Sequence, residues 1–245
     1  GLQDAYLVYE IVVEGGITRY LALFKDKEPE IVGSVRSARH YYLDYVLEND
    51  AYYVHWGWSP QAQSDIRSLG IQNINALTYS SPYFFRKQYG NVSTEHTGYA
   101  NIKEIAKLVK NKGYRSESNK DLLLNYSATP IHPEVEGGVA NKLSFKYSNG
   151  FVTNYTYDEA SNTYLQSVNN TPHTDYQTKK QYTVKNILVY QVGNKAIAGD
   201  NKGRQDLDNI GSGEGYFITG GVSYPITWQK EKRESQTIYK YKSTG

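Results

Sequence analysis

Apolar positions follow two different periods along the chain. In the first half, residues 4–14 and 17–24 are rich in β-branched and aromatic side chains, a composition typical of strands. Gly15 and Gly16 lie between them, where a positive φ costs glycine little. This pattern predicts a β-hairpin at the start of the chain.

Helical spacing alternates with strand signals in the rest of the first half. The segment 36–50 carries Leu43, Val46 and Leu47 on one helical face, with Ser37 placed to cap the helix. Residues 50–56 return to a strand pattern, and residues 59–70 begin with Ser-Pro and end with Gly, as helices commonly do.

A last helix is predicted over 101–114. It has an apolar face and lysines in its final turns, and glycine ends it. The first half therefore predicts helices packed on a sheet.

From residue 143 onward the pattern changes to short strands separated by turn residues. The segment 127–142 before it is rich in Pro, Gly and small polar residues and has no periodicity. We therefore predict an α+β protein with two domains and a boundary at about 127–142. Residues 1–130 form a mixed α/β domain, and residues 131–245 form an antiparallel β domain, either a sandwich or a half-open barrel.

Composition excludes several classes of function. The 245 residues carry a formal net charge of +2, which is far from the charge of a general nucleic-acid binder. The absence of cysteine removes disulfides, thiolate nucleophiles and Cys-based metal sites. No two histidines have the i, i+4 spacing of a zinc helix, so we expect neither a metal nor another cofactor.

The strongest candidate site is an arginine pair at the predicted start of the 36–50 helix. Arg36, Ser37 and Arg39 lie where free backbone N–H groups and the helix dipole would favour an anion. Two guanidinium groups match a carboxylate or phosphate bidentately. The alternative is structural: both arginines pair with local acids, such as Glu14, Asp44 or Asp50, and hold the domain together.

Further polar residues fall near predicted element ends in the first half. Glu14 and Arg19 flank the hairpin turn, and His55 ends a strand. Arg86 and His96 follow later in the same domain. If these side chains converge, the site is cationic and binds an acid.

Two features of the second half carry weaker signals. His173 and Asp175 lie close together in a polar stretch. Residues 211–217 have glycine at alternate positions, but no helix or Gly-Lys-Ser/Thr follows. We interpret them as a turn entering a strand rather than a phosphate loop.

Taken in order, several motifs resemble the YerB-like lipoproteins of bacteria. They include VYEIVVEGGITRYLALF, VGSVRSARHYYLDY, YYVHWGWSPQA and EHTGYANIKEI in the first half, and GRQDLDNIGSGEGYFITGG in the second. The resemblance implies an extracytoplasmic protein whose activity is unassigned. It would be anchored to the outer face of the cytoplasmic membrane by a lipid on an N-terminal cysteine outside this chain. It also implies that one strand is missing from this chain at each end.

Three functions stay open. The first is a binding module for an acidic envelope group, such as a peptidoglycan carboxylate or a polymer phosphate, at the arginine residues. The second is an interaction scaffold that binds an envelope protein by strand addition to the β domain. The third, ranked last because we lean against an enzyme, is a hydrolase in which His55 or His96 acts as base with Glu14 as acid.

Overall fold

The protein is described by a computed structural model that covers residues 1–115 and 117–245. It divides into two compact units. The first comprises Gly1–Tyr9 and Leu21–Leu123, and the second comprises Glu10–Tyr20 and Leu124–Gly245. A single boundary near residue 130 would have left the whole N-terminal hairpin in the first unit, whereas the structure assigns the hairpin tip to the second.

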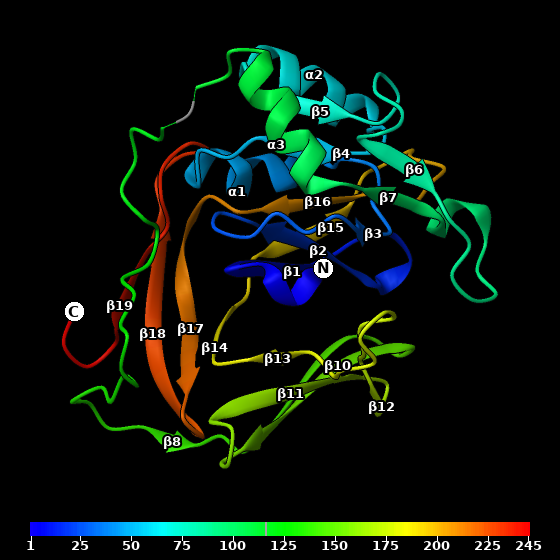
Figure 1. Ribbon diagram of the computed structural model, residues 1–245. Helices are drawn as coiled ribbons and strands as arrows, with labels where there is room; N and C mark the ends of the chain where they lie inside the picture. Colours follow the sequence, from blue (N-terminus) through cyan, green and yellow to red (C-terminus); the bar gives the residue numbers. More distant parts are fainter. Residues whose placement is uncertain (116) are drawn as a thin grey trace. The chain divides into compact units, whose positions relative to one another are not determined.

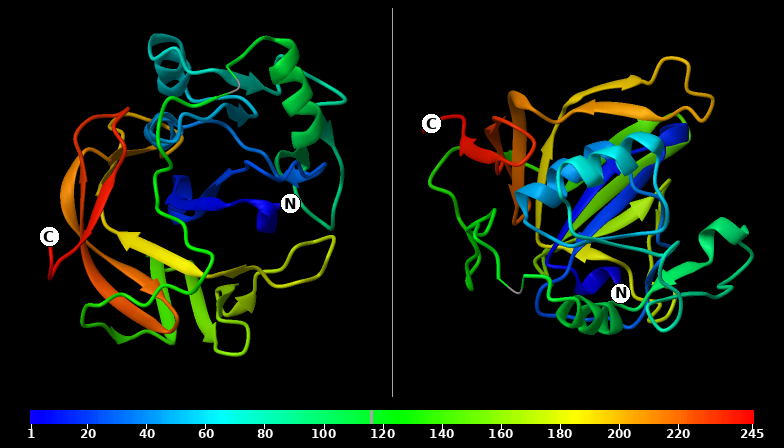
Figure 2. Two further views of the ribbon diagram at one scale, coloured as in Figure 1. Left: turned by 60° about the vertical axis from the view of Figure 1, so that its left-hand side comes forward. Right: turned by 90° about the horizontal axis from the view of Figure 1, so that it is seen from above.

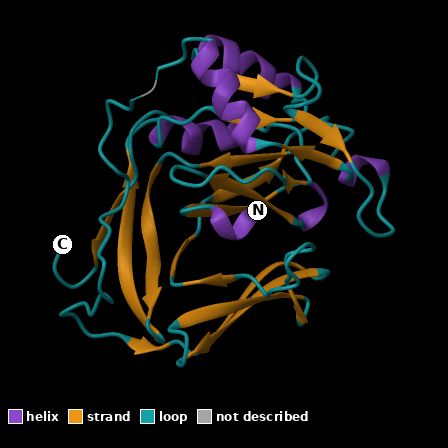
Figure 3. Cartoon of the chain, in the orientation of Figure 1, coloured by secondary structure: helices purple, strands orange, loops and turns teal. Residues whose placement is uncertain are grey.

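Strands dominate the chain as a whole, and most of them belong to the second unit (Figure 3). Over the described ranges the α-helices are α1 (Leu43–Glu48), α2 (Pro60–Ser68) and α3 (Ile102–Asn111). Short 3₁₀ turns are η1 (Leu2–Asp4), η2 (Glu14–Gly16), η3 (His40–Tyr42) and η4 (Thr94–His96). The two-part α+β organisation is thus mostly β, with less helix than the sequence pattern predicts.

The strands of the N-terminal half form small sheets rather than one large sheet. The predicted hairpin is present as β1 (Leu7–Val12) and β2 (Thr18–Leu23), with positive φ at Gly15 and Gly16. The strands β3 (Val32–Gly33), β7 (Gly98–Ala100) and β6 (Phe84–Arg86) pair in that order, all antiparallel. The strands β4 (Tyr53–His55) and β5 (Asn73–Asn75) are parallel, and α2 is the crossover between them.

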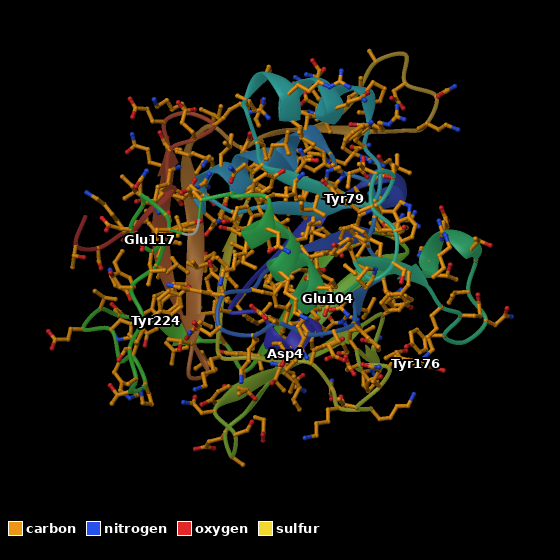
Figure 4. The ribbon with its side chains drawn as sticks, turned by 45° about the horizontal axis from the view of Figure 1, so that its top comes forward. Asp4, Tyr79, Glu104, Glu117, Tyr176 and Tyr224 are labelled. Carbon is orange, nitrogen blue, oxygen red and sulfur yellow. The ribbon has the colours of Figure 1, made fainter. Side chains whose placement is uncertain are left out.

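The helix α3 packs on these strands, as predicted (Figure 1). Its buried residues Ile105 and Val109 join a core with Ile74, Phe84 and Ala100. The side chain of Asn101 caps the backbone N–H of Glu104 at 3.1 Å, and Glu104 is labelled in Figure 4. An apolar face and a capped start therefore explain why this segment is helical.

The helix α2 begins as its sequence predicts. Ser59 Oγ accepts a hydrogen bond from the backbone N–H of Ala62 at 3.2 Å, and Pro60 occupies the first helical position. Gly70 follows the helix with φ of 63°. The cap matters for the site described below because α2 follows directly on the exit of β4.

Replacing Ser59 with alanine is expected to lower the free energy of unfolding by about 1 kcal/mol, because one backbone N–H of α2 loses its acceptor. Denaturant unfolding followed by circular dichroism measures this loss. Ser68→Ala makes the same chemical change at the exposed end of the helix. An equal loss in both variants would contradict the capping role.

The predicted helix over 36–50 is wrong in its first half. Residues 36–38 are extended beside residues 56–59: Trp56 N donates to Arg36 O, and Ala38 N donates to Gly57 O. Ser37 lies in this extended segment, and its hydroxyl donates to Trp56 O at 3.1 Å. Because this neighbouring segment takes up the backbone groups, the helical turn starts only at His40, and α1 starts at Leu43.

The second unit contains two five-stranded antiparallel sheets. One is built from β12 (Thr171–Pro172), β11 (Thr163–Val168), β10 (Phe151–Asp158) and β9 (Lys142–Ser148), with β13 (Thr183–Val184) also paired to β11. The other is built from β14 (Asn186–Tyr190), β17 (Gly211–Thr219), β18 (Val222–Lys230) and β19 (Ile238–Tyr241), with β8 (Gly138–Val139) also paired to β18.

The chain passes from one sheet to the other at residue 185, between β13 and β14. Between the sheets lies a core of buried Ala140, Tyr155, Tyr164 and Ile218. This matches the predicted antiparallel β unit. A two-stranded hairpin that the sequence pattern did not indicate, β15 (Gly193–Ala196) with β16 (Gln205–Asp208), projects beyond β14 and β17 (Figure 2).

Candidate functional site

The carboxyl ends of the parallel strands β4 and β5 meet at one edge of the first unit. Asn75 ends β5, and its Oδ1 accepts from the backbone N–H of Gly57 at 2.9 Å and from that of Leu77 at 3.1 Å. One side chain therefore fixes the exits of both strands. Chain exits from parallel strands are where α/β proteins commonly bind ligands.

His55 lies at this edge, as predicted, but it is only 1% exposed. Its Nδ1 lies 2.8 Å from Gly57 O, and its Nε2 lies 3.1 Å from Asn73 Oδ1. Burial lowers the pKa of His55, although both hydrogen bonds act in the opposite direction. With both nitrogens engaged and no access to solvent, His55 supports the fold and offers no general base.

Two arginines converge on the turn that contains η4. Arg36 donates to Glu95 O at 2.6 Å and to Glu95 Oε2 at 3.1 Å. Arg86 donates to Thr94 O at 2.7 Å and to Thr97 Oγ1 at 3.1 Å. Its guanidinium also lies 4.4 Å from the ring centre of Trp56. We call this group, formed by Arg36, Trp56, Arg86 and residues 94–97, the arginine turn.

The arginine turn has more positive than negative charge. Arg36 is 25% exposed and its partner Glu95 is 63% exposed, so this is a surface ion pair. Within the ranges that the structure covers, Arg86 contacts no carboxylate. His96 is exposed, and its Nε2 lies 3.5 Å from Glu95 Oε1. One acidic side chain therefore pairs with Arg36, whereas the positive charge of Arg86 is met by neutral oxygen atoms and the ring of Trp56.

The other predicted site residues lie elsewhere. Glu14 and Arg19 pair with each other at 3.3 Å, as their flanking positions suggested, but both belong to the second unit. Arg39 donates to the carbonyl oxygens of Ser37 and Ala38. Within the first unit, the predicted cationic residues that bond to the same turn are Arg36 and Arg86.

The predicted position of Arg36 at a helix start is wrong, and its acidic partner comes from a distant segment. Arg36 precedes α1 by several residues, so the predicted anion site at a helix start does not exist. The acid that pairs with Arg36 is Glu95, which belongs to the same domain but is not one of the three acids named as examples. Glu95 is distant in sequence and reaches Arg36 only through the pairing of β3 with β7 and of β7 with β6.

The sequence analysis missed Trp56, Asn73, Asn75 and Glu95. Asn73 and Asn75 alternate with Ile74 in a strand, a pattern that could have indicated one polar face. Trp56 carried a local signal as well, since it follows His55 at a strand end. No local signal pairs Glu95 with Arg36.

The described part of the chain holds no group of three or more His, Cys, Asp or Glu side chains arranged to bind a metal ion. Within the same ranges, the helices are too short or too polar to span a bilayer.

Two family models of DUF3048, a protein family of unknown function, match the chain. The model of its N-terminal domain matches residues 1–115, and the model of its C-terminal domain matches residues 143–245. Together with the relative described next, these matches show that the chain belongs to the DUF3048 family. The relative comes from Bacillus subtilis (strain 168) and bears the name "Putative lipoprotein YerB". It is 31% identical over 233 residues, which make up 94% of this chain and 68% of the relative.

The crystal structure of the YerB protein from Bacillus subtilis has the same fold. It superposes with a TM-score of 0.80 at 28% identity, over 99% of this chain and 79% of that chain. The resemblance to the YerB-like proteins is therefore confirmed in both sequence and structure.

Proposed function

We propose that this protein is an extracytoplasmic envelope lipoprotein, as the name of its relative suggests, and that it binds an anionic group of the envelope at the arginine turn. One observation supports the binding proposal: Arg36 and Arg86 bond to the same turn, where the exposed carboxylate of Glu95 pairs with Arg36 and Arg86 bonds to neutral oxygen atoms. The ligand class is a carboxylate or a phosphate, because both match the planar fork of arginine.

The exchange of Glu95 for an external anion costs little. An exposed ion pair of this kind contributes about 0–1 kcal/mol, so an incoming oxyanion competes easily with the Glu95 side chain. The backbone carbonyls of Thr94 and Glu95 would keep both guanidinium groups in place during the exchange. Stacking of Arg86 on Trp56 holds its orientation as well.

Replacing Arg36 and Arg86 with alanine is expected to weaken binding to purified cell-wall fragments by about tenfold for each arginine, because each removes a charge-assisted contact. Glu95→Gln is expected to tighten binding several-fold, because it removes the internal competitor and leaves both arginines intact. Co-sedimentation at low and high salt measures both effects, and salt should weaken the wild type most.

The matched control is Lys103→Ala, which removes a surface cation of the same unit that pairs with Glu30 away from the turn. It should leave binding unchanged. Unaltered binding in the Arg36→Ala, Arg86→Ala double variant would end the proposal.

The two other functions have less support. A hydrolase would need an accessible base beside a free acid. His55 is buried with both nitrogens bonded, and the exposed His96 lies beside Glu95, an acid that already pairs with Arg36. Strand addition would need an edge strand that can pair with a strand of another protein. The edge strand β9 carries the exposed lysines Lys142 and Lys146, which disfavour such pairing. We therefore propose binding at the arginine turn alone.

A further inference from the structure

A largely buried carboxyl group, that of Glu10, lies in the second unit. Glu10 Oε1 accepts hydrogen bonds from Thr18 Oγ1 at 2.9 Å and from Thr153 Oγ1 at 2.6 Å. Its Oε2 is 3.4 Å from the hydroxyl of Tyr155. All of these partners are neutral hydroxyl groups.

A chain of hydrogen bonds connects this carboxyl to a histidine. Gln166 Nε2 donates to the hydroxyl groups of Tyr155 and Tyr20, each at 3.0 Å. Gln166 Oε1 lies 3.0 Å from His173 Nδ1, and the His173 ring stacks on Tyr20 with a centroid distance of 5.8 Å. The buried side chain of Gln166 therefore links His173 to Tyr155, and Tyr155 contacts Glu10.

These contacts lie where the chain enters and leaves the second unit. Glu10 is the first residue of the hairpin tip assigned to that unit, and Tyr20 is the last. Glu10 bonds to β10, while Tyr20 accepts from Gln166 on β11. The polar cluster therefore fixes both ends of the tip to one sheet.

No cationic side chain among the residues with described positions compensates Glu10. The titratable groups that face Glu10 and His173 from neighbouring elements are tyrosines: Tyr20 of β2, Tyr147 of β9, Tyr155 of β10 and Tyr182 before β13. Tyr182 also donates to Asp175, the one other acid of the cluster. The surroundings therefore favour uncharged forms at both ends.

We propose that Glu10 and His173 are the two titrating ends of a proton-sensitive latch, which holds the hairpin tip of residues 10–20 on the β9–β13 sheet when both side chains are uncharged. The latch is closed by the hydrogen bonds through Tyr155 and Gln166. Charge at either end weakens the docking, because that charge would be largely removed from water without a counter-ion.

The two ends respond to pH in opposite directions. Burial raises the pKa of Glu10 above 4.5, so its contribution is complete below pH 4.5 and is lost as the pH rises through the raised pKa. Burial lowers the pKa of His173 below 6.5, so its contribution is complete above pH 6.5 and is lost as the pH falls through the lowered pKa. The pH response of Glu10 can be measured alone when His173 is replaced by a neutral residue, and that of His173 can be measured alone when Glu10 is replaced.

The test is hydrogen exchange of the backbone amides in residues 10–20 between about pH 4 and pH 8, corrected for intrinsic exchange, with α3 as the internal reference. An undocked two-stranded hairpin is marginally stable in water, so undocking exposes its amides to exchange. In Glu10→Gln, protection should fall only as the pH is lowered. In His173→Gln, protection should fall only as the pH is raised, because Glu10 then loses its proton. The expected fall is up to tenfold for each pH unit.

The Glu10→Gln, His173→Gln double variant should show protection that does not depend on pH. Glu14→Gln is the matched control, because it neutralises an acid of the same hairpin whose partner is Arg19, and it should keep the wild-type profile. The latch is disproved if the double variant keeps the wild-type profile, or if either single variant keeps the pH response that it should lose.

Discussion

Replacing His55 with alanine is expected to lower the free energy of unfolding by about 3 kcal/mol, because it creates a cavity and leaves buried polar groups unpaired. His55 contacts the rings of Tyr53 and Trp58, and its nitrogens bond to Gly57 O and Asn73 Oδ1. Denaturant unfolding at pH 8 measures the loss. Under conditions in which the variant is folded, it should still bind cell-wall fragments.

The loss should become smaller in acid. Because burial lowers the pKa of His55, the wild type loses stability as the pH falls below 6.5, and the variant has no such group to protonate. Unfolding curves at pH 5 and pH 8 compare the two proteins. His96→Ala is the control, since His96 is exposed and should change stability by less than about 0.5 kcal/mol. A stable His55→Ala protein would show that this residue is not structural.

Sequence patterns predicted most elements because the deciding interactions are local. In α2 the signals are Ser59, Pro60 and Gly70, and in the hairpin they are Gly15 and Gly16. Each acts on a neighbouring backbone group, so spacing alone is informative.

The helix prediction was wrong for residues 36–42 because the interaction that decides their structure is not local. Their apolar spacing suits a helix, but the backbone of residues 36–38 bonds to residues 56–59. Tertiary pairing then overrides the local preference. Distant contacts of the same kind occur in the hairpin tip of residues 10–20, where Glu10 bonds to Thr153 and Tyr20 bonds to Gln166.

The candidate site was predicted only in part for the same reason. The sequence pointed to Arg36 and Arg86, whose side chains do meet at one turn. It could not identify Glu95 as the acid that pairs with Arg36, nor could it assign Arg19 to the second unit, where Arg19 pairs with Glu14. Side-chain pairing across sheets depends on strand order, which local patterns do not specify.

The alternating glycines of residues 211–217 lie within a strand, whereas the sequence suggested a turn that enters one. They begin β17, and the structure shows why glycine is needed there. A Cβ on Gly213 would lie 2.6 Å from Nε1 of buried Trp228. A Cβ on Gly215 would approach the backbone oxygen of Val189 on the paired strand β14. The glycines therefore allow close packing and have no role in phosphate binding.

Replacing Gly215 with alanine is expected to lower the free energy of unfolding by about 3 kcal/mol, because the added methyl group meets a backbone atom that cannot rotate away. Gly213→Ala should cost less, since the Trp228 side chain can shift where a backbone carbonyl cannot. Gly150→Ala is the control, because a Cβ there has no neighbour within 4 Å. Denaturant unfolding of the three variants should therefore rank their losses in the order Gly215, Gly213, Gly150. An equal loss at Gly150 and Gly215 would contradict this explanation. The cost would then come from the backbone preference of glycine and not from the contact between β14 and β17.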